Sequence, residues 1–194
     1  MKTNIFSAIR LTIVCLVFFS GIYTAIVFGV AQLAPNNGKG FVVKYENTKS
    51  DSSRTFFCFE NMGQKFSEDR YFYSRPSAVD YNAAGSAGSN KGPSNPDYLA
   101  QVQARIDTFL LHNSGVEKSQ IPSELVTASG SGLDPNISVD AAKVQIKRIA
   151  KTRGIAEPNI EQLILSNTET PLFGIFGPEK INVLKLNIAL DNLN

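Results

Sequence analysis

The sequence is poor in the residues on which catalysis and metal binding most often depend. Its 194 residues include no tryptophan, a single histidine, His112, and two cysteines, Cys15 and Cys58. One histidine cannot form a metal cluster, and a Ser-His-Asp or Cys-His triad would have to recruit it from a predicted helix end. Two cysteines, one of them in an apolar N-terminal run, do not indicate a disulfide framework. We therefore expect no catalytic set and no metal site.

Charge is also scarce, and the chain has no basic run. Lys2 and Arg10 account for the formal net charge of +2, so the 17 other basic residues balance the 17 acidic ones. A nucleic-acid-binding protein needs a concentrated cationic patch, and a protein that binds lipid headgroups electrostatically needs a polybasic stretch. The sequence contains neither, and we expect no nucleic acid among its partners.

What the sequence does contain is one long apolar run, residues 11–33, without a charged residue. At about 1.5 Å per residue this run makes a helix of about 34 Å, which exceeds a hydrocarbon core of about 30 Å. A secretory signal peptide has a shorter apolar region, about 7–15 residues, followed by a small-x-small cleavage site. No such site follows here, so the run predicts a single transmembrane helix at residues 11–33 after a short leader, residues 1–10.

Small residues recur along one side of this predicted helix. Gly21, Ala25 and Gly29 are spaced at i, i+4 and i+8, which lets a neighbouring helix approach closely enough for van der Waals packing. Glycine is also common in membrane helices in general, and this alternative stays open. The run has no ionisable residue with which to build an ion pathway, so we expect it to pack against a partner rather than to conduct ions.

Beyond a hinge at residues 34–40, which is rich in Pro, Gly and Asn, the pattern predicts one soluble α+β domain at residues 41–194. Basic residues near the end of its second helix, among them Arg148 and Arg153, would complement the helix dipole. The expected strands are 41–45 and 56–59, and the expected helices run from Asn95-Pro96 to 112–115, from Ser138 to Gly154, and from Pro158 onward. The stretch 84–96 has the composition of a flexible linker.

The C-terminal segment predicts a β-hairpin. Its two arms are LFGIF, residues 172–176, and INVLKLNIAL, residues 181–190, separated by a turn at 177–180. Leu184, Leu186 and Leu190 alternate with other residues in the second arm, which indicates a half-buried strand.

Two loops dense in Ser, Asn and Gly, residues 71–98 and 126–138, are the candidate interaction sites. Neither loop completes a nucleophile-elbow or a phosphate-loop motif. Their backbone N–H groups could cradle an anion or meet a partner, or their polar groups could satisfy one another within a compact loop; both alternatives stay open. The candidate residues are Ser74, Arg75, Asn82, Ser89, Asn90, Ser94 and Asn95 in the first loop, and Ser129, Gly130, Ser131, Gly132 and Asp134 in the second.

These two loops also carry a family resemblance. YFYSRPSAVDYNAAGSAGSNKGPSNP (71–96) and VTASGSGLDPNIS (126–138) closely resemble motifs of the KdpC family, the C subunit of the Kdp-type potassium-transporting P-type ATPase. MGQKF, AAKVQIKRIAKTRG and INVLKLNIAL follow that family's order, so the resemblance covers nearly the whole chain. Tyr73 and Asn136 depart from the family, which usually carries Trp and His at these positions.

The resemblance implies an accessory, non-catalytic subunit of a potassium-transporting complex in the cell inner membrane. Its expected partners are a potassium-translocating subunit, a P-type ATP-hydrolysing subunit and a small single-helix subunit. The family is described as a catalytic chaperone that raises the ATP affinity of the hydrolysing subunit. The resemblance therefore implies no cofactor on this chain alone, and ATP only together with that subunit.

The side of the membrane decides how such an effect could work. Arg10 beside the apolar run favours a cytoplasmic N-terminus and a periplasmic soluble domain, although Lys39 and Lys44 nearly balance the count. In that orientation any effect on ATP affinity is a coupling free energy between distant sites. The alternative is a cytoplasmic domain that binds nucleotide directly through residues 129–132 with Arg75 or Lys91. A third alternative is a membrane-anchored hydrolase built on a serine of residues 129–131.

Overall fold

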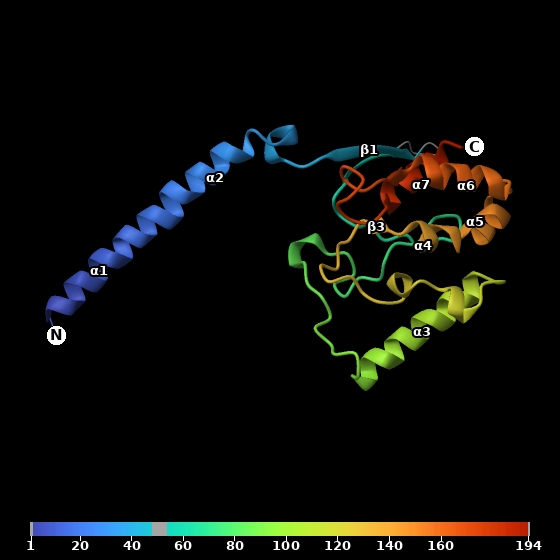
Figure 1. Cartoon of the computed structure of the whole chain (residues 1–194), viewed down its shortest axis with the longest axis horizontal. Coiled ribbons are helices and arrows are strands. Elements are labelled where there is room, and N and C mark those ends of the chain that lie inside the picture. Colours follow the sequence, from blue (N-terminus) through green and yellow to red (C-terminus); the bar gives the residue numbers. More distant parts are fainter. Residues whose placement is uncertain (1, 48–53, 194) are drawn as a thin grey trace. The chain divides into compact units, whose positions relative to one another are not determined.

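A computed structural model describes residues 2–47 and 54–193 and divides the chain into two compact units, Met1–Val42 and Val43–Asn194. The first unit is a helical rod made of α1 (Lys2–Leu16), the π-helical segment η1 (Val17–Tyr23) and α2 (Thr24–Ala31), as Figure 1 shows. Among the described residues, Asn4–Ala31 is the one helix long and apolar enough to cross a membrane. The expected leader is thus helical from Lys2, and the helix ends at Ala31 rather than at residue 33.

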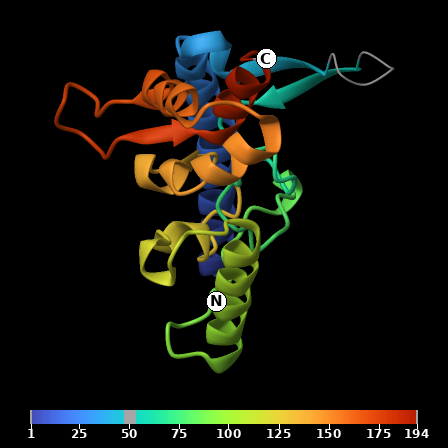
Figure 2. The ribbon, with the colours of Figure 1, turned by 90° about the vertical axis from the view of Figure 1, so that its right-hand side faces the viewer.

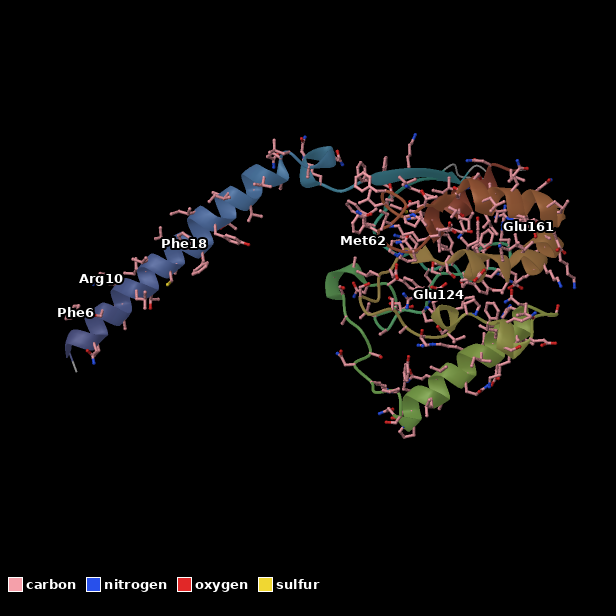
Figure 3. The ribbon with its side chains drawn as sticks, in the orientation of Figure 1. Phe6, Arg10, Phe18, Met62, Glu124 and Glu161 are labelled. Atoms are coloured by element: carbon pink, nitrogen blue, oxygen red, sulfur yellow. The ribbon has the colours of Figure 1, made fainter. Side chains whose placement is uncertain are left out.

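The rod exposes its apolar side chains along its whole length, as Phe6 and Phe18 illustrate in Figure 3. The turns of η1 are wider than those of an α-helix. Two of its carbonyls, those of Ser20 and Phe19, accept a hydrogen bond from the hydroxyl of Thr24. Gly21 lies inside this segment, so its i, i+4 step to Ala25 covers a smaller rotation than in an α-helix. The predicted small-residue face therefore begins at a place where the helix is wider than the sequence spacing assumes.

Within its described residues, 43–47 and 54–193, the second unit combines two small sheets with five α-helices, which confirms the predicted α+β class. Its antiparallel three-stranded sheet has the order β3-β5-β4, with Ile181 of β5 opposite Ile137 on one side and Thr168 on the other. Figures 1 and 2 show α4 to α7 grouped at one end of this unit and α3 apart from them at the other.

The strands are β1 (Val42–Asn47), β2 (Arg54–Phe59), β3 (Asn136–Ile137), β4 (Thr168–Glu169) and β5 (Lys180–Asn182), and β1 pairs with β2. The helices are α3 (Pro96–His112), α4 (Val139–Lys143), α5 (Ile146–Arg153), α6 (Glu157–Ser166) and α7 (Val183–Asp191). Short 3-10 turns are η2 (Pro35–Gly38), η3 (Ala83–Gly85), η4 (Lys118–Gln120) and η5 (Ser123–Leu125).

Helix α3 begins and ends as the sequence predicts, and so does the α4–α5 segment. The side chain of Asn95 accepts a hydrogen bond from the amide of Tyr98, and Ser138 accepts one from Ala141. Gly154 follows α5 in the left-handed conformation, φ 68°, that favours glycine. One feature was not predicted: the helix is interrupted between Lys143 and Ile146, so α4 and α5 are separate.

The second arm of the predicted hairpin is a helix, so that prediction is wrong for residues 183–191. Asn182 caps α7 through its side chain, which accepts the amide proton of Lys185. The buried residues of α7 follow helical spacing, which the alternating leucines also satisfy. The strands of the actual hairpin are the much shorter β4 and β5.

One hydrophobic core holds α4 to α7 and the three-stranded sheet together. Its members come from α4 to α7 and from the strands β3 and β5, with Phe72, Phe109 and Leu125 from the rest of the unit. The fully buried large side chains of this core include Phe72, Ile149, Ile160, Ile164, Ile181, Leu186 and Leu190. Phe72, at the start of the first candidate loop, is thus packed against these helices.

Candidate functional site: two cross-bonded loops

The two candidate loops contact each other along their length. The amide of Ser129 donates to the carbonyl of Pro76 at 3.0 Å, and the hydroxyl of Ser86 donates to the carbonyl of Ser131 at 2.9 Å. The expected flexible linker is therefore fastened to the second loop at its N-terminal end. We call the joined surface of residues 71–90 and 126–136 the loop platform.

Glycine is required where the loops approach most closely. Gly132 has φ +69°, and a Cβ there would lie 2.7 Å from Cγ2 of Val79 and 2.8 Å from the carbonyl oxygen of Ala87. A Cβ on Gly88 would lie 2.9 Å from the carbonyl oxygen of Gly130. Gly130 itself faces open space. The platform is therefore packed backbone to backbone at two points.

An ion pair joins the loops at their base. Nη1 of Arg75 lies 2.8 Å from Oδ2 of Asp134, and Oδ1 of Asp134 accepts the amide proton of Asn136 at 3.0 Å. The hydroxyl of Tyr81 donates to the carbonyl of Arg75 at 2.6 Å, and burial, with Asp80 nearby, raises the pKa of Tyr81 to about 12. The charged ends of Arg75 and Asp134 are thus held by each other and by the loop.

The platform surrounds an open hollow of about 540 Å³. Met62, which Figure 3 labels, is part of its wall, while Ser129 is almost fully buried beneath it. The hollow is lined by Asn61, Met62, Ala83, Ser86, Ser129, Gly130, Ser131, Leu133, Asp134 and Pro135. Its polar groups are backbone, hydroxyl and amide groups with one carboxylate, which suits hydrogen bonding to a partner surface.

The structure brings only some of the predicted residues to this hollow. Ser74 lies behind it, where its hydroxyl donates to the carbonyl of Gln64 at 2.7 Å. Asn82 and Asn95 serve as caps of η3 and α3. The predicted residues that line the hollow are Ser129, Gly130, Ser131 and Asp134. Arg75 pairs with Asp134, and Gly132 packs against the first loop. Ser89, Asn90 and Ser94 lie away from the hollow and are exposed. Gly21, Ala25 and Gly29 belong to the other unit, and among the described residues a Cβ at Gly21 or Gly29 would meet no atom within 4 Å beyond its own helix backbone and adjacent residues.

Sequence reasoning missed the buried polar cluster behind the platform, which centres on Arg148. The guanidinium of Arg148 donates to the carbonyls of Asp69 and Tyr71, to Oδ1 of Asn113 at 3.0 Å and to Oε1 of Gln145 at 2.7 Å. Burial lowers the pKa of Arg148, which is 6% exposed, against smaller opposing effects of neighbouring groups. This residue fixes the backbone at Asp69 and Tyr71, where the first loop of the platform begins.

Tyr73 is held from both sides by the same cluster. Its amide donates to Oε1 of Gln145 at 2.7 Å, and its ring centroid lies 3.8 Å from Cζ of Arg148. Its hydroxyl donates to Oδ1 of Asp69, and the same oxygen lies 2.8 Å from Nδ1 of His112. The hydrogen bond from Tyr73, assisted by His112, lowers the pKa of Asp69, while burial and Asp69 raise that of Tyr73 to about 12.

The side-chain amide of Asn187 attaches Phe72 to α7. Its oxygen accepts the amide proton of Phe72 at 2.8 Å, and its nitrogen donates to the carbonyl of Phe72 at 3.0 Å. Nearby, the guanidinium of Arg153 donates to the carbonyl of Arg70 and to Asp191, both at 2.7 Å. Each of residues 70–73 therefore has at least one backbone group bonded to a side chain of α5, of α7 or of Gln145. Arg153 lies in the last turn of α5, where the sequence places it, and both Arg148 and Arg153 also hold the backbone of residues 69–71.

A signal for Arg148 was available in the helical spacing. Ala141, Gln145 and Arg148 are separated by four and three residues, which places them on one side of a helix. Ala141 and Ile149 are fully buried on that side. A long cationic side chain on an apolar stripe indicates a buried hydrogen-bonding task rather than a solvated one.

Across residues 2–47 and 54–193 no three His, Cys, Asp or Glu side chains are grouped as metal ligands would be. What the platform offers is shape and hydrogen-bonding capacity.

Comparison with known proteins gives a consistent result. The family described as "KdpC: K+-transporting ATPase, c chain" matches residues 5–192. The chain is 52% identical over 190 residues to the potassium-transporting ATPase KdpC subunit of Flavobacterium johnsoniae, covering 98% of each protein. It is 48% identical over 194 residues to the KdpC subunit of Bacteroides thetaiotaomicron, again covering 98% of each. With the KdpC subunit of Caldanaerobacter subterraneus the identity is 41% over 191 residues, 98% of this chain and 95% of the relative.

Proposed function

Because the chain belongs to the KdpC family, the c chain of the K+-transporting ATPase, we propose that it acts in that complex as a non-catalytic docking subunit. Its helix docks through Gly21, Ala25 and Gly29, and its loop platform caps or braces the potassium-translocating subunit. The P-type ATP-hydrolysing subunit and the small single-helix subunit are its further partners. The complex lies in the cell inner membrane, with the N-terminus of this chain in the cytoplasm and its soluble domain in the periplasm.

The observation that carries the proposal is the rigidity of the platform. Its loops are bonded to each other at Ser129 and Ser86, and residues 70–73 are bonded to α5 and α7. A long polar loop that is already ordered loses little conformational entropy on binding, which favours its use as a docking surface. Of the two alternatives that the sequence left open, the internal hydrogen bonds support mutual satisfaction of the polar groups, and contact with a partner is the part that we propose.

The effect on ATP affinity follows as a second part of the proposal. A periplasmic domain cannot contact cytoplasmic ATP, so it raises the ATP affinity of the hydrolysing subunit through the complex. By reciprocity, ATP binding then strengthens the attachment of this subunit by the same factor. Direct nucleotide binding on the cytoplasmic side is the alternative, and it receives less support because Arg75 is paired with Asp134 and Ser129 is buried.

Docking of the helix predicts a loss of assembly when the small residues are enlarged. In the double variant Gly21→Leu plus Gly29→Leu, the added side chains would keep a neighbouring helix at a distance and forfeit its van der Waals contacts. We expect several-fold less of the other subunits to co-purify with the tagged chain from detergent-solubilised membranes. The control is Val27→Leu plus Val30→Leu, which adds bulk to exposed positions of α2 without removing a small residue. An intact, fully active complex in the glycine variant would show that the helix does not dock there.

Orientation can be tested by labelling single cysteines. Native Cys58 is a poor reporter because it is half-buried and burial raises the pKa of its thiol, which leaves less reactive thiolate. In a background with Cys15→Ser and Cys58→Ala, we expect Ser94→Cys, at an exposed position, to react with an impermeant maleimide in intact spheroplasts. Asn4→Cys, the reciprocal control, should react only after lysis. The reverse pattern would place the domain in the cytoplasm and favour direct nucleotide binding.

A further inference from the structure

The hairpin between β4 and β5 ends in a cluster of exposed apolar side chains. Leu172, Phe173, Ile175 and Phe176 are 64, 83, 78 and 66% exposed, and we call residues 172–176 the apolar tip. Figure 2 shows this orange-red segment projecting from the body of its unit. Isolated exposed apolar residues are normal on a protein surface, but four large ones within five residues are not.

The tip has a defined backbone rather than a loose one. Leu172 and Phe176 exchange two backbone hydrogen bonds of 3.0 Å, and the amide of Gly174 donates to Pro171 at 2.8 Å. Ile175 donates to the carbonyl of Leu172 at 3.2 Å. The turn requires a positive φ of 55° at Phe173, which is unfavourable for a bulky side chain. The backbone is thus closed on itself at the cost of local strain, and its apolar side chains point outward.

Charged residues are absent from the end of the hairpin and present at its base. From Thr170 to Pro178 there is no charged residue. At the base, Nζ of Lys180 lies 3.5 Å from Oε2 of Glu169, its partner across the two strands. The hairpin is therefore polar and paired where it leaves the sheet and uncharged where it ends. A segment with internally bonded backbone groups and no charge is the kind that can leave water at low cost.

The geometry points to the bilayer as the occupant: we propose that the apolar tip inserts into the interfacial layer of the membrane that the chain's own helix crosses. The inference rests on Asn4–Ala31 being a membrane span. Only residues 32–41 separate α2 from β1, so the tether can reach at most about 35 Å, and the domain is always held near a lipid surface. A second copy of the chain or a protein partner is a weaker candidate, because stable protein interfaces use about 20–30 residues a side and the tip has far fewer.

Because the sequence has no tryptophan, a single one can report on the tip. The full chain with Phe173→Trp is reconstituted into phosphatidylcholine vesicles whose lipids carry bromine on the upper part of one acyl chain. The matched control is Leu111→Trp at an exposed position at the end of α3, and Phe176→Trp serves as a second probe should the strained position not tolerate the change.

We expect bromolipid to quench the tryptophan of both tip variants several times more strongly than that of Leu111→Trp, with a blue-shifted emission for the tip variants alone. Equal quenching of tip and control variants would overturn the proposal. So would a tip that is not quenched in vesicles but becomes shielded from an aqueous quencher when the other subunits of the complex are present, because that result assigns the tip to a protein partner.

Discussion

Replacing Arg148 by methionine should destabilise the soluble domain more than any other single change to its polar residues. The variant loses every hydrogen bond of the guanidinium: Oδ1 of Asn113 loses its donor, and Oε1 of Gln145 keeps only the amide of Tyr73. A buried acceptor left without its donor costs about 1–3 kcal/mol, and here Oδ1 of Asn113 and the carbonyls of Asp69 and Tyr71 all lose the guanidinium. We expect the thermal midpoint of the detergent-solubilised chain, followed by circular dichroism, to fall by roughly 10 °C.

Lys147→Met is the matched control, since Lys147 is the exposed neighbour of Arg148 on the same helix. A surface change of this kind usually alters the free energy of unfolding by less than about 0.5 kcal/mol. Arg148→Lys should keep the charge and lose most of the stability, because an ammonium group cannot reach four acceptors in one plane. If the methionine and control variants unfold at the same temperature, Arg148 does not hold residues 69–73 in place.

Gly132→Ala should separate the two loops of the platform. The new Cβ would lie 2.7 Å from Cγ2 of Val79 and 2.8 Å from a backbone oxygen, so the loop that carries Ala87 must shift. The positive φ adds a conformational cost of about 1 kcal/mol and the overpacking about 1–3 kcal/mol. We expect a total destabilisation of about 2–4 kcal/mol, measured by denaturant unfolding.

Gly130→Ala, two residues away, provides the control, because its Cβ would meet nothing within 4 Å. Gly132→Ala also tests the docking proposal when co-purification of the other subunits is measured at a temperature where the variant is folded. The proposal predicts weaker assembly for Gly132→Ala, whereas Gly130→Ala is a control for stability only, because Gly130 lines the hollow. Normal assembly with a disrupted platform would contradict docking through these loops.

The fold was predictable where a local signal acts alone. Asn95, Ser138 and Gly154 mark helix ends through capping, and the structure places α3, α4 and α5 between them. Residues 183–191 were mispredicted because leucines spaced by two satisfy both a strand and a helix pattern over so short a length. The cap formed by Asn182 was the signal that could have decided in favour of a helix.

The candidate site was predictable as a pair of loops but not as a geometry. The composition of residues 71–98 and 126–138 singled them out, yet which serine is buried and which is open depends on contacts between segments about 50 residues apart. Sequence spacing says nothing about such contacts. The spacing also gives no sign that Ser89, Asn90 and Ser94 lie away from the hollow while Ser86 lines it.

The π-helical segment Val17–Tyr23 has a consequence for the length of the membrane helix. A widened turn accommodates an extra residue while the faces before and after it keep their alignment. A one-residue deletion between 17 and 23 can therefore be absorbed by a return to α-helical geometry, whereas the same deletion within α2 would rotate all later residues by about 100°.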